Sequence, residues 1–102
     1  MLVQFSIVPL GKEGDSVSEH VSKVLKIVDE SGLPYRLTPM ATIVEGEWDE
    51  VMALIRKCQL EVLRGVPRQL TTIIVDDRPG KTSRITEKIR SVEKRLGREL
   101  KK

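Results

Sequence analysis

A short segment near the middle of the chain brings together side chains that could recognise a small molecule. Thr42, Glu45 and Glu47 follow one another closely, and Trp48 comes directly after them. Two carboxylates can accept hydrogen bonds from an amine, balance a cationic ligand, or act as an acid–base pair if burial separates their pKa values. The hydroxyl of Thr42 can donate to a ligand heteroatom. This combination predicts a small-molecule site.

Each of these side chains also has an ordinary structural explanation. On a regular strand Glu45 and Glu47 would share a face, but Glu47 could instead belong to the first turn of a helix, where the positive end of the helix dipole favours an acid. Threonine is common in strands. A tryptophan that opens a helix, as Trp48 would, is more often a partly buried anchor than a stacking surface. Both explanations therefore stay open for Glu47, and Trp48 is expected to be an anchor.

Two serines at the start of a predicted helix add a further candidate. Ser16 fits a capping box with Glu19, so its expected role is to cap the helix. Ser18 lies in the first turn, where backbone N–H groups and a hydroxyl can face a ligand. The predicted ligand-binding residues are Ser18, Thr42, Glu45 and Glu47.

Few other residues could support catalysis or metal binding. Cys58 is the only cysteine and lies on the apolar stripe of a predicted helix, so we expect a buried, unreactive thiol. His20 is the only histidine and has no Cys or Asp neighbour at ligand spacing. No nucleophile–base pair, P-loop or dinucleotide-binding turn appears. We therefore expect no enzyme activity, no cofactor and no metal.

The length and composition are those of a single small domain. The chain has 102 residues and a net charge of +3, which comes largely from the carboxyl-terminal tail; we expect one domain over residues 1–102. The apolar first ten residues are too short to span a bilayer and follow no basic region, which favours a cytoplasmic protein. Asparagine is absent and Lys, Arg and Glu dominate the polar residues, which is typical of thermophiles.

Hydrophobic spacing and turn residues predict the order β-α-β-β-α-β-α. The expected strands are residues 2–10, 35–38, 41–45 and 68–76, and the expected helices are residues 16–30, 48–64 and 82–97. Pro39 separates the middle strands because proline cannot donate to a ladder. This order is the ferredoxin-like plan of the α+β class, a four-stranded antiparallel sheet with two helices on one face, followed here by an additional carboxyl-terminal helix.

The opposite face of the predicted sheet has no cover among the first four strands and two helices. Either the last helix or another subunit must bury it. The residues predicted there form the mixed polar and apolar surface typical of an interface: Gln4, Ser6, Val8, Thr72 and Ile74. A homo-oligomer is therefore the preferred explanation.

Five segments occur in one order and together resemble a known family: Ser16-Val-Ser18, Ser31-Gly-Leu-Pro-Tyr35, Pro39-Met-Ala-Thr42, Glu45-Gly-Glu47 with Asp49-Glu50-Val51, and Asp76-Asp-Arg78. The chain resembles the small thiamine-binding protein family over nearly its whole length. The resemblance implies a ferredoxin-like subunit that assembles into dimers and usually tetramers through its sheets. It also implies binding of thiamine or its hydroxymethylpyrimidine part, without known catalysis. The family commonly has glycine where this chain has Ala41.

The expected function is therefore recognition of a small molecule. We predict a non-catalytic, homo-oligomeric binding protein for thiamine or a related hydroxymethylpyrimidine, used in storage, delivery or sensing. A cationic thiazolium and an aminopyrimidine would complement acids and hydroxyls beside an aromatic wall. Two alternatives stay open: a nucleic-acid-binding module that uses the basic last helix, and a small carboxylate-dependent enzyme acting on a heterocycle.

Overall fold

Four strands and three helices follow one another in the order that the sequence predicts. The computed structural model describes residues 1–11, 17–80 and 84–97. The elements are β1 (Leu2–Leu10), α1 (Val17–Glu30), β2 (Tyr35–Leu37), β3 (Thr42–Glu45), α2 (Trp48–Leu63), β4 (Arg68–Asp76) and α3 (Arg84–Leu96). The ferredoxin-like α+β fold with an additional carboxyl-terminal helix is thereby confirmed. The predicted cap at Ser16 lies outside the described residues.

The sheet is fully antiparallel, with the strand order β2-β3-β1-β4. The central strand β1 pairs with β3 from Leu2 opposite Glu45 to Phe5 opposite Thr42. On its other side, β1 pairs with β4 along its whole length. Because side chains alternate between the two faces of a strand, this register fixes which residues share a face. It leaves β2 and β4 as the two edge strands.

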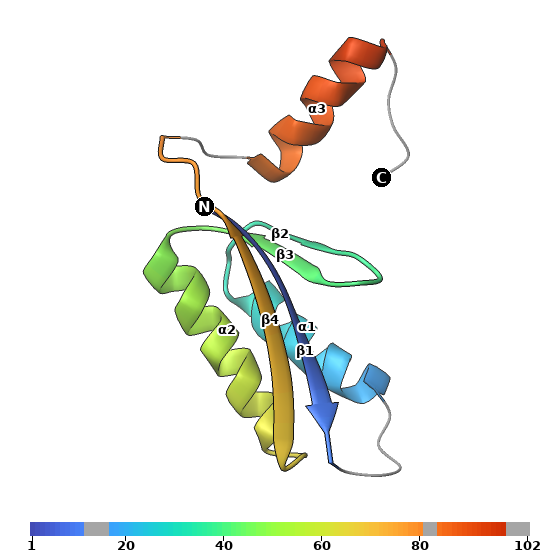
Figure 1. Cartoon of the computed structure of the whole chain (residues 1–102), viewed down its shortest axis with the longest axis vertical. Coiled ribbons are helices and arrows are strands. Elements are labelled where there is room, and N and C mark those ends of the chain that lie inside the picture. The colour runs from blue at the N-terminus through green and yellow to red at the C-terminus, as the bar shows by residue number, and fades with distance from the viewer. Residues whose placement is uncertain (12–16, 81–83, 98–102) are drawn as a thin grey trace.

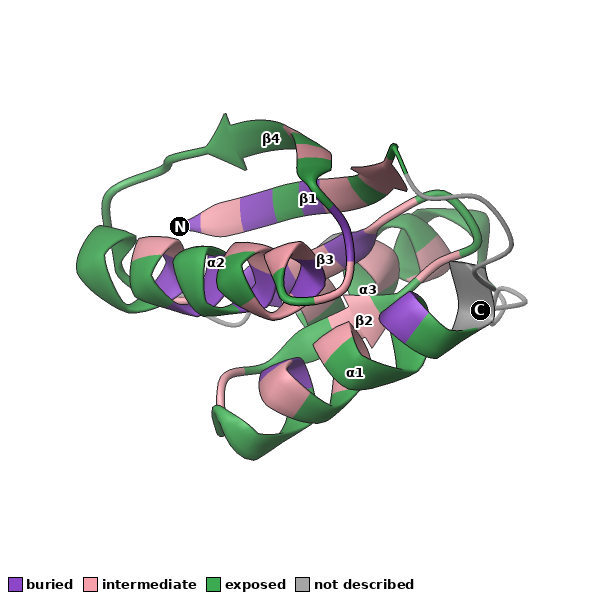
Figure 2. Cartoon of the chain, turned by 90° about the horizontal axis from the view of Figure 1, so that it is seen from below, coloured by how far each residue is buried: buried purple, intermediate pink, exposed green. Residues whose placement is uncertain are grey.

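The core lies between one face of the sheet and the two helices α1 and α2. β1 contributes Val3 and Phe5, β3 contributes Val44, and α2 contributes Ile55 and other side chains that are all buried. Figure 2 shows buried segments along β1, β3 and α2. Apolar side chains recur about every 3.6 residues along a helix and every two residues along a strand. Both sets therefore point into this single layer between the sheet and the helices.

The opposite face of the sheet, here called the open face, is left largely uncovered. The helix α3 does not lie on it but extends beyond the end of the sheet where β1 begins and β4 ends (Figure 1). The radius of gyration is 15.3 Å, compared with about 13 Å for a compact chain of this length. None of the helices in the described part of the chain is long and apolar enough to cross a membrane.

A glycine at the end of β1 meets a tight contact that a side chain would disturb. Gly11 has a φ of 87°, and a Cβ added there would lie 2.8 Å from Cγ of Pro67. A left-handed conformation costs an L-residue about 1–2 kcal/mol, and the close contact adds to this. We expect Gly11→Ala to lower the free energy of unfolding more than Gly32→Ala, a control with a φ of 77° and no atom within 4 Å of the added Cβ. Urea denaturation measures both losses; equal losses would contradict the tight packing of Gly11 on Pro67.

Candidate functional site

The hairpin of β2 and β3 forms one wall of a cavity of about 490 Å³. The other walls are the second half of β1 and the first half of α1, and the cavity is here called the hairpin cavity. Its lining is mainly apolar, with Phe5 from β1, Val24 from α1 and Leu37 from β2 among the contributors. Ligand pockets for small molecules have this size and this predominance of apolar walls.

Thr42 is the predicted site residue that lines the hairpin cavity. It begins β3 directly after the turn, lies opposite Phe5 of β1, and is buried. Within the described part of the chain, its side-chain hydroxyl has no hydrogen-bond partner. A hydroxyl that borders a cavity can hydrogen-bond a heteroatom of a ligand placed there.

The hydroxyl of Thr38 holds the turn that shapes the mouth of the cavity. It donates to the carbonyl oxygen of Ala41 at 2.8 Å and accepts from the backbone N–H of Ala41 at 3.0 Å. The backbone N–H of Thr38 also donates to the Ala41 carbonyl oxygen, at 3.0 Å. These bonds close the turn around Pro39, which the sequence predicts only as a break between two strands. The tip is therefore a tied loop, with Met40 strongly exposed at its end.

Ser18 lies in the first turn of α1, the helix that forms one wall of the hairpin cavity. Its backbone is described, but its side chain lies outside the described part of the structure. Its position in the chain places it at the end of α1 that borders the hairpin cavity, two residues before the cavity-lining His20. It stays a predicted ligand-binding residue.

Glu45 ends β3 on the opposite face of the sheet. It pairs with Leu2 of β1, whereas Thr42 pairs with Phe5. Residues three apart on a strand face opposite sides and lie about 10 Å apart. The buried carboxylate of Glu45 accepts a hydrogen bond from the backbone N–H of Ile85, at 3.4 Å from Oε1. Glu45 therefore contacts the first turn of α3 and supplies a negative charge at the positive end of that helix.

Glu47 is the N-cap of α2, so the structure favours its structural explanation. Its backbone N–H donates to Oε1 of Glu50 at 3.3 Å, and its carbonyl oxygen accepts from Val51 N–H at 3.0 Å. The strand β3 ends at Glu45, so of the two explanations left open for Glu47 the structure shows the helix start and not a shared strand face. Trp48 opens α2, as predicted, and its side chain is 56% exposed, so it is anchored only in part.

Both glutamates line a second cavity of about 450 Å³, here called the Glu45 cavity. Arg36 and Tyr35 from β2 and Ile85 from α3 also border it. The hydroxyl of Tyr35 donates to Asp29 at 2.9 Å, and this bond to a carboxylate raises the pKa of the tyrosine. The structure thus brings Glu45 and Glu47 together, but it separates them from Thr42 and Ser18.

The sequence reasoning missed most of the residues that line the hairpin cavity. Neither Val24 nor His20 is predicted from the sequence as a cavity residue, and His20 is weighed there only as a metal ligand. His20 is buried, lines the cavity, and lies against Gly65, where an added Cβ would be 3.3 Å from its Cε1. The sequence signal that could have pointed to this cavity is the polar imidazole ring of His20 on the apolar face of a predicted helix.

The single thiol is poorly placed for nucleophilic chemistry. Cys58 is buried in α2, and burial raises its pKa to about 11. A thiol with that pKa stays protonated near neutral pH, and the thiolate is the reactive form. Among residues 1–11, 17–80 and 84–97, no group of three or more His, Cys, Asp or Glu side chains could hold a metal ion.

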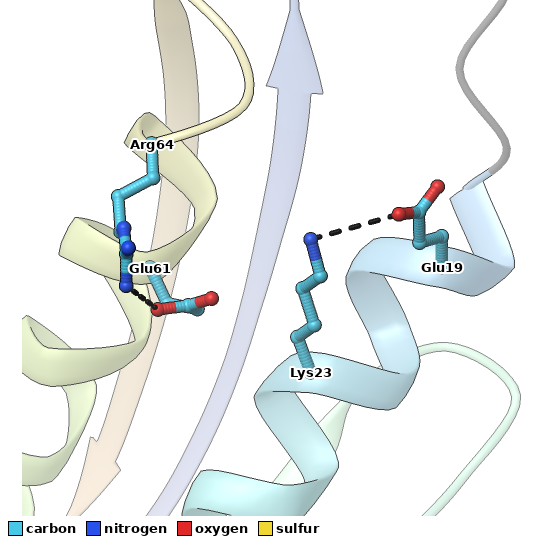
Figure 3. Close-up of polar contacts among 4 residues, drawn as sticks. All are labelled: Glu19, Lys23, Glu61 and Arg64. Carbon is cyan, nitrogen blue, oxygen red and sulfur yellow. Dashed lines mark hydrogen bonds and ion pairs between the residues drawn. The ribbon is translucent and has the colours of Figure 1, made fainter.

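The outer surfaces of α1 and α2 carry charges of both signs. Nζ of Lys23 lies 3.6 Å from Oε1 of Glu19, and Nη1 of Arg64 lies 3.4 Å from Oε2 of Glu61 (Figure 3). Such exposed pairs contribute little to stability, at about 0.2–1 kcal/mol each. Binding of nucleic acid favours a surface of basic residues alone. The cations of this surface instead lie beside acids of their own helices, so it is not such a patch.

Known proteins of similar length match nearly the whole chain. The family described as thiamine-binding protein matches residues 3–93. A UPF0045 protein of Mycobacterium bovis is 41% identical over 97 residues, which cover 94% of each chain. A UPF0045 protein of Bacillus subtilis is 37% identical over 100 residues, which cover 93% of this chain and 96% of its own. The crystal structure of a hypothetical protein from Methanocaldococcus jannaschii has a TM-score of 0.79 at 31% identity, covering 89% of this chain and 93% of that one.

Proposed function

This chain belongs to the thiamine-binding protein family, and from that membership we propose that it binds thiamine or its hydroxymethylpyrimidine part without catalysing a reaction. We place the ligand in the hairpin cavity. The observation that carries this placement is the position of Thr42, a buried residue whose hydroxyl borders a mainly apolar cavity of about 490 Å³. Ser18, at the start of the helix that forms the opposite wall, is the second proposed contact.

The chemistry of the cavity favours the pyrimidine end of such a ligand. A flat heteroaromatic ring fits between apolar walls such as Phe5 and Val24, while a single hydroxyl such as that of Thr42 can bond a ring nitrogen or the amino group. The described lining includes no Asp or Glu, so it supplies no carboxylate to balance a thiazolium cation. The cation is therefore placed at the mouth, near the exposed Met40, where water can solvate it.

Glu45 and Glu47 are proposed as ligand groups only for the second cavity. Their carboxylates could receive an amino group or a cation there, but Arg36 lines the same cavity and offsets part of the negative charge. Glu45 also holds the first turn of α3, and Glu47 caps α2. Both acids thus have structural roles that Thr42 lacks, and this difference ranks the hairpin cavity first.

A binding role without turnover is consistent with the side chains around the hairpin cavity. Among the residues that the structure describes, the polar lining consists of hydroxyls and one histidine, without a carboxylate that could orient a general base. The buried Cys58 has a raised pKa. Storage, delivery or sensing requires only that the ligand binds and leaves, and we place these roles in the cytoplasm.

We also propose that the working form is a homo-oligomer, a dimer or tetramer assembled through sheet edges and faces. The strand β4 lies at an edge of the sheet in the described structure, so one side of its nine-residue backbone faces no other strand. Its apolar side chains Ile73, Ile74 and Val75 are exposed on both faces. An exposed edge with apolar side chains is typical of a strand that pairs with another chain.

Calorimetric titration with thiamine and with hydroxymethylpyrimidine tests the proposed ligand. We expect both compounds to bind with similar affinity, because the pyrimidine carries the contacts in the cavity. A thermal shift assay with the same compounds provides an independent measurement. No heat and no rise in melting temperature with either compound would contradict the proposal, and binding of thiamine alone would contradict the placement of the pyrimidine.

A further inference from the structure

The imidazole of His20 is a polar ring in the wall of the hairpin cavity. His20 lies near the start of α1, is 7% exposed, and borders the cavity from the helix side. Thr42 borders the same cavity from β3. Buried polar side chains in folded proteins have hydrogen-bonding roles. A ligand between these two walls would therefore meet a polar group on each side.

The other polar side chains of the cavity wall are engaged or point elsewhere. The described lining residues with polar side chains are Ser6, His20, Thr38 and Thr42. The hydroxyl of Thr38 bonds both the carbonyl oxygen and the N–H of Ala41. Ser6 follows Phe5 along β1, and because side chains alternate between the faces of a strand, it points away from the core that holds Phe5. Thr42 and His20 are thus the side chains placed to bond a ligand in the cavity.

The turn after α2 limits the position of the imidazole. A Cβ added at Gly65 would lie 3.3 Å from Cε1 of His20, so the ring lies against this glycine. Gly65 is not among the described lining residues of the cavity, whereas the buried Val62 in the last turn of α2 is. The imidazole therefore has the cavity on one side and a packed turn on another. Close packing leaves the ring little room to turn away from a ligand.

We propose that His20 accepts a hydrogen bond from the amino group of the bound pyrimidine, while the hydroxyl of Thr42 donates to a ring nitrogen. This inference rests on the ligand and the cavity of the proposed function and names the residue that selects the ligand. A ring nitrogen only accepts, so it requires the hydroxyl, whereas the amino group donates and a neutral imidazole offers one accepting nitrogen. The second imidazole nitrogen can serve the protein at the same time. A cavity built in this way selects an aminopyrimidine over a pyrimidine that lacks the amino group.

Two ligands and one substitution test this hydrogen bond. The ligands are hydroxymethylpyrimidine, which carries the amino group, and the same compound without that group. Calorimetry with the wild-type chain is expected to give about tenfold weaker binding of the second compound, the effect of losing one hydrogen bond in a buried site. His20→Phe keeps a flat ring and removes both nitrogens, so this variant should bind the two compounds with equal affinity. An undiminished preference for the amino compound in a His20→Phe chain that thermal denaturation shows to be folded would overturn the assignment.

Gly65→Ala provides a second variant, which moves the imidazole without altering it. The φ of Gly65 lies outside the left-handed region, so alanine suits the backbone, and the added methyl requires the ring to shift by a few tenths of an ångström. We expect severalfold weaker binding of hydroxymethylpyrimidine, unchanged binding of the compound without the amino group, and no further loss when Gly65→Ala is added to His20→Phe. Equal losses with both compounds would overturn the inference, as would a wild-type chain that binds both compounds equally. A wild-type chain that binds neither compound nor thiamine would overturn the proposed function itself.

Discussion

Thr42→Val is expected to weaken the binding of thiamine and hydroxymethylpyrimidine by about tenfold or more while leaving the fold intact. Valine has nearly the same shape and suits a strand, so the substitution removes the hydroxyl and little else. Loss of one hydrogen bond costs about 0.5–1.5 kcal/mol, and more when the ligand group is left unpaired in a buried site; about 1.4 kcal/mol corresponds to tenfold in affinity. Calorimetry with both compounds measures the change.

Glu45→Gln is the control that separates the two cavities. Glutamine keeps the length of the side chain, and its amide oxygen can still accept from Ile85 N–H. Since Glu45 faces the side of the sheet away from Thr42, the substitution should leave affinity unchanged. If Thr42→Val left the ligand affinity unchanged and Glu45→Gln weakened it, the ligand would instead be placed in the Glu45 cavity.

The order of the elements could be predicted because each has its own local signal. The strand 68–76 has a β-branched run that ends in a Pro-Gly turn, and α2 has the apolar spacing of Val51, Leu54, Ile55 and Cys58. Both elements have nearly the predicted bounds. Periodicity within about ten residues contains this information, so the sequence alone is sufficient.

The arrangement of the candidate site could not be predicted in the same way. Whether Glu45 and Glu47 share a face depends on the residue at which β3 ends, and single-residue boundaries are poorly determined by periodicity. Glu47 is the helix cap because its backbone N–H donates to the Glu50 carboxylate at the start of α2. The hairpin cavity depends on how four successive elements, β1, α1, β2 and β3, pack against one another. Its lining residues look like ordinary core positions until those elements are packed together.

The second large effect concerns the core beside the hairpin cavity. Phe5→Ala is expected to lower the free energy of unfolding by about 3–5 kcal/mol, the range for removal of a buried phenylalanine ring. Phe5 is 2% exposed and belongs to the core cluster of β1, β3 and α2. Small domains have total stabilities of about 5–15 kcal/mol, so the loss is a large part of the whole. Urea denaturation measures it, with the exposed Leu60→Ala as a control expected to stay within about 0.5 kcal/mol.

Phe5→Leu separates the two roles of this ring. Leucine keeps most of the buried apolar surface, so the variant should fold and lose less stability than Phe5→Ala. The flat ring that borders the hairpin cavity is nevertheless gone, and with it the wall on which a pyrimidine can stack. We expect ligand affinity to fall severalfold in a variant whose folding is nearly intact. Unchanged affinity would mean that the ligand lies against α1 and not against β1, so the wall of the cavity that carries recognition would be the helix that begins near Ser18.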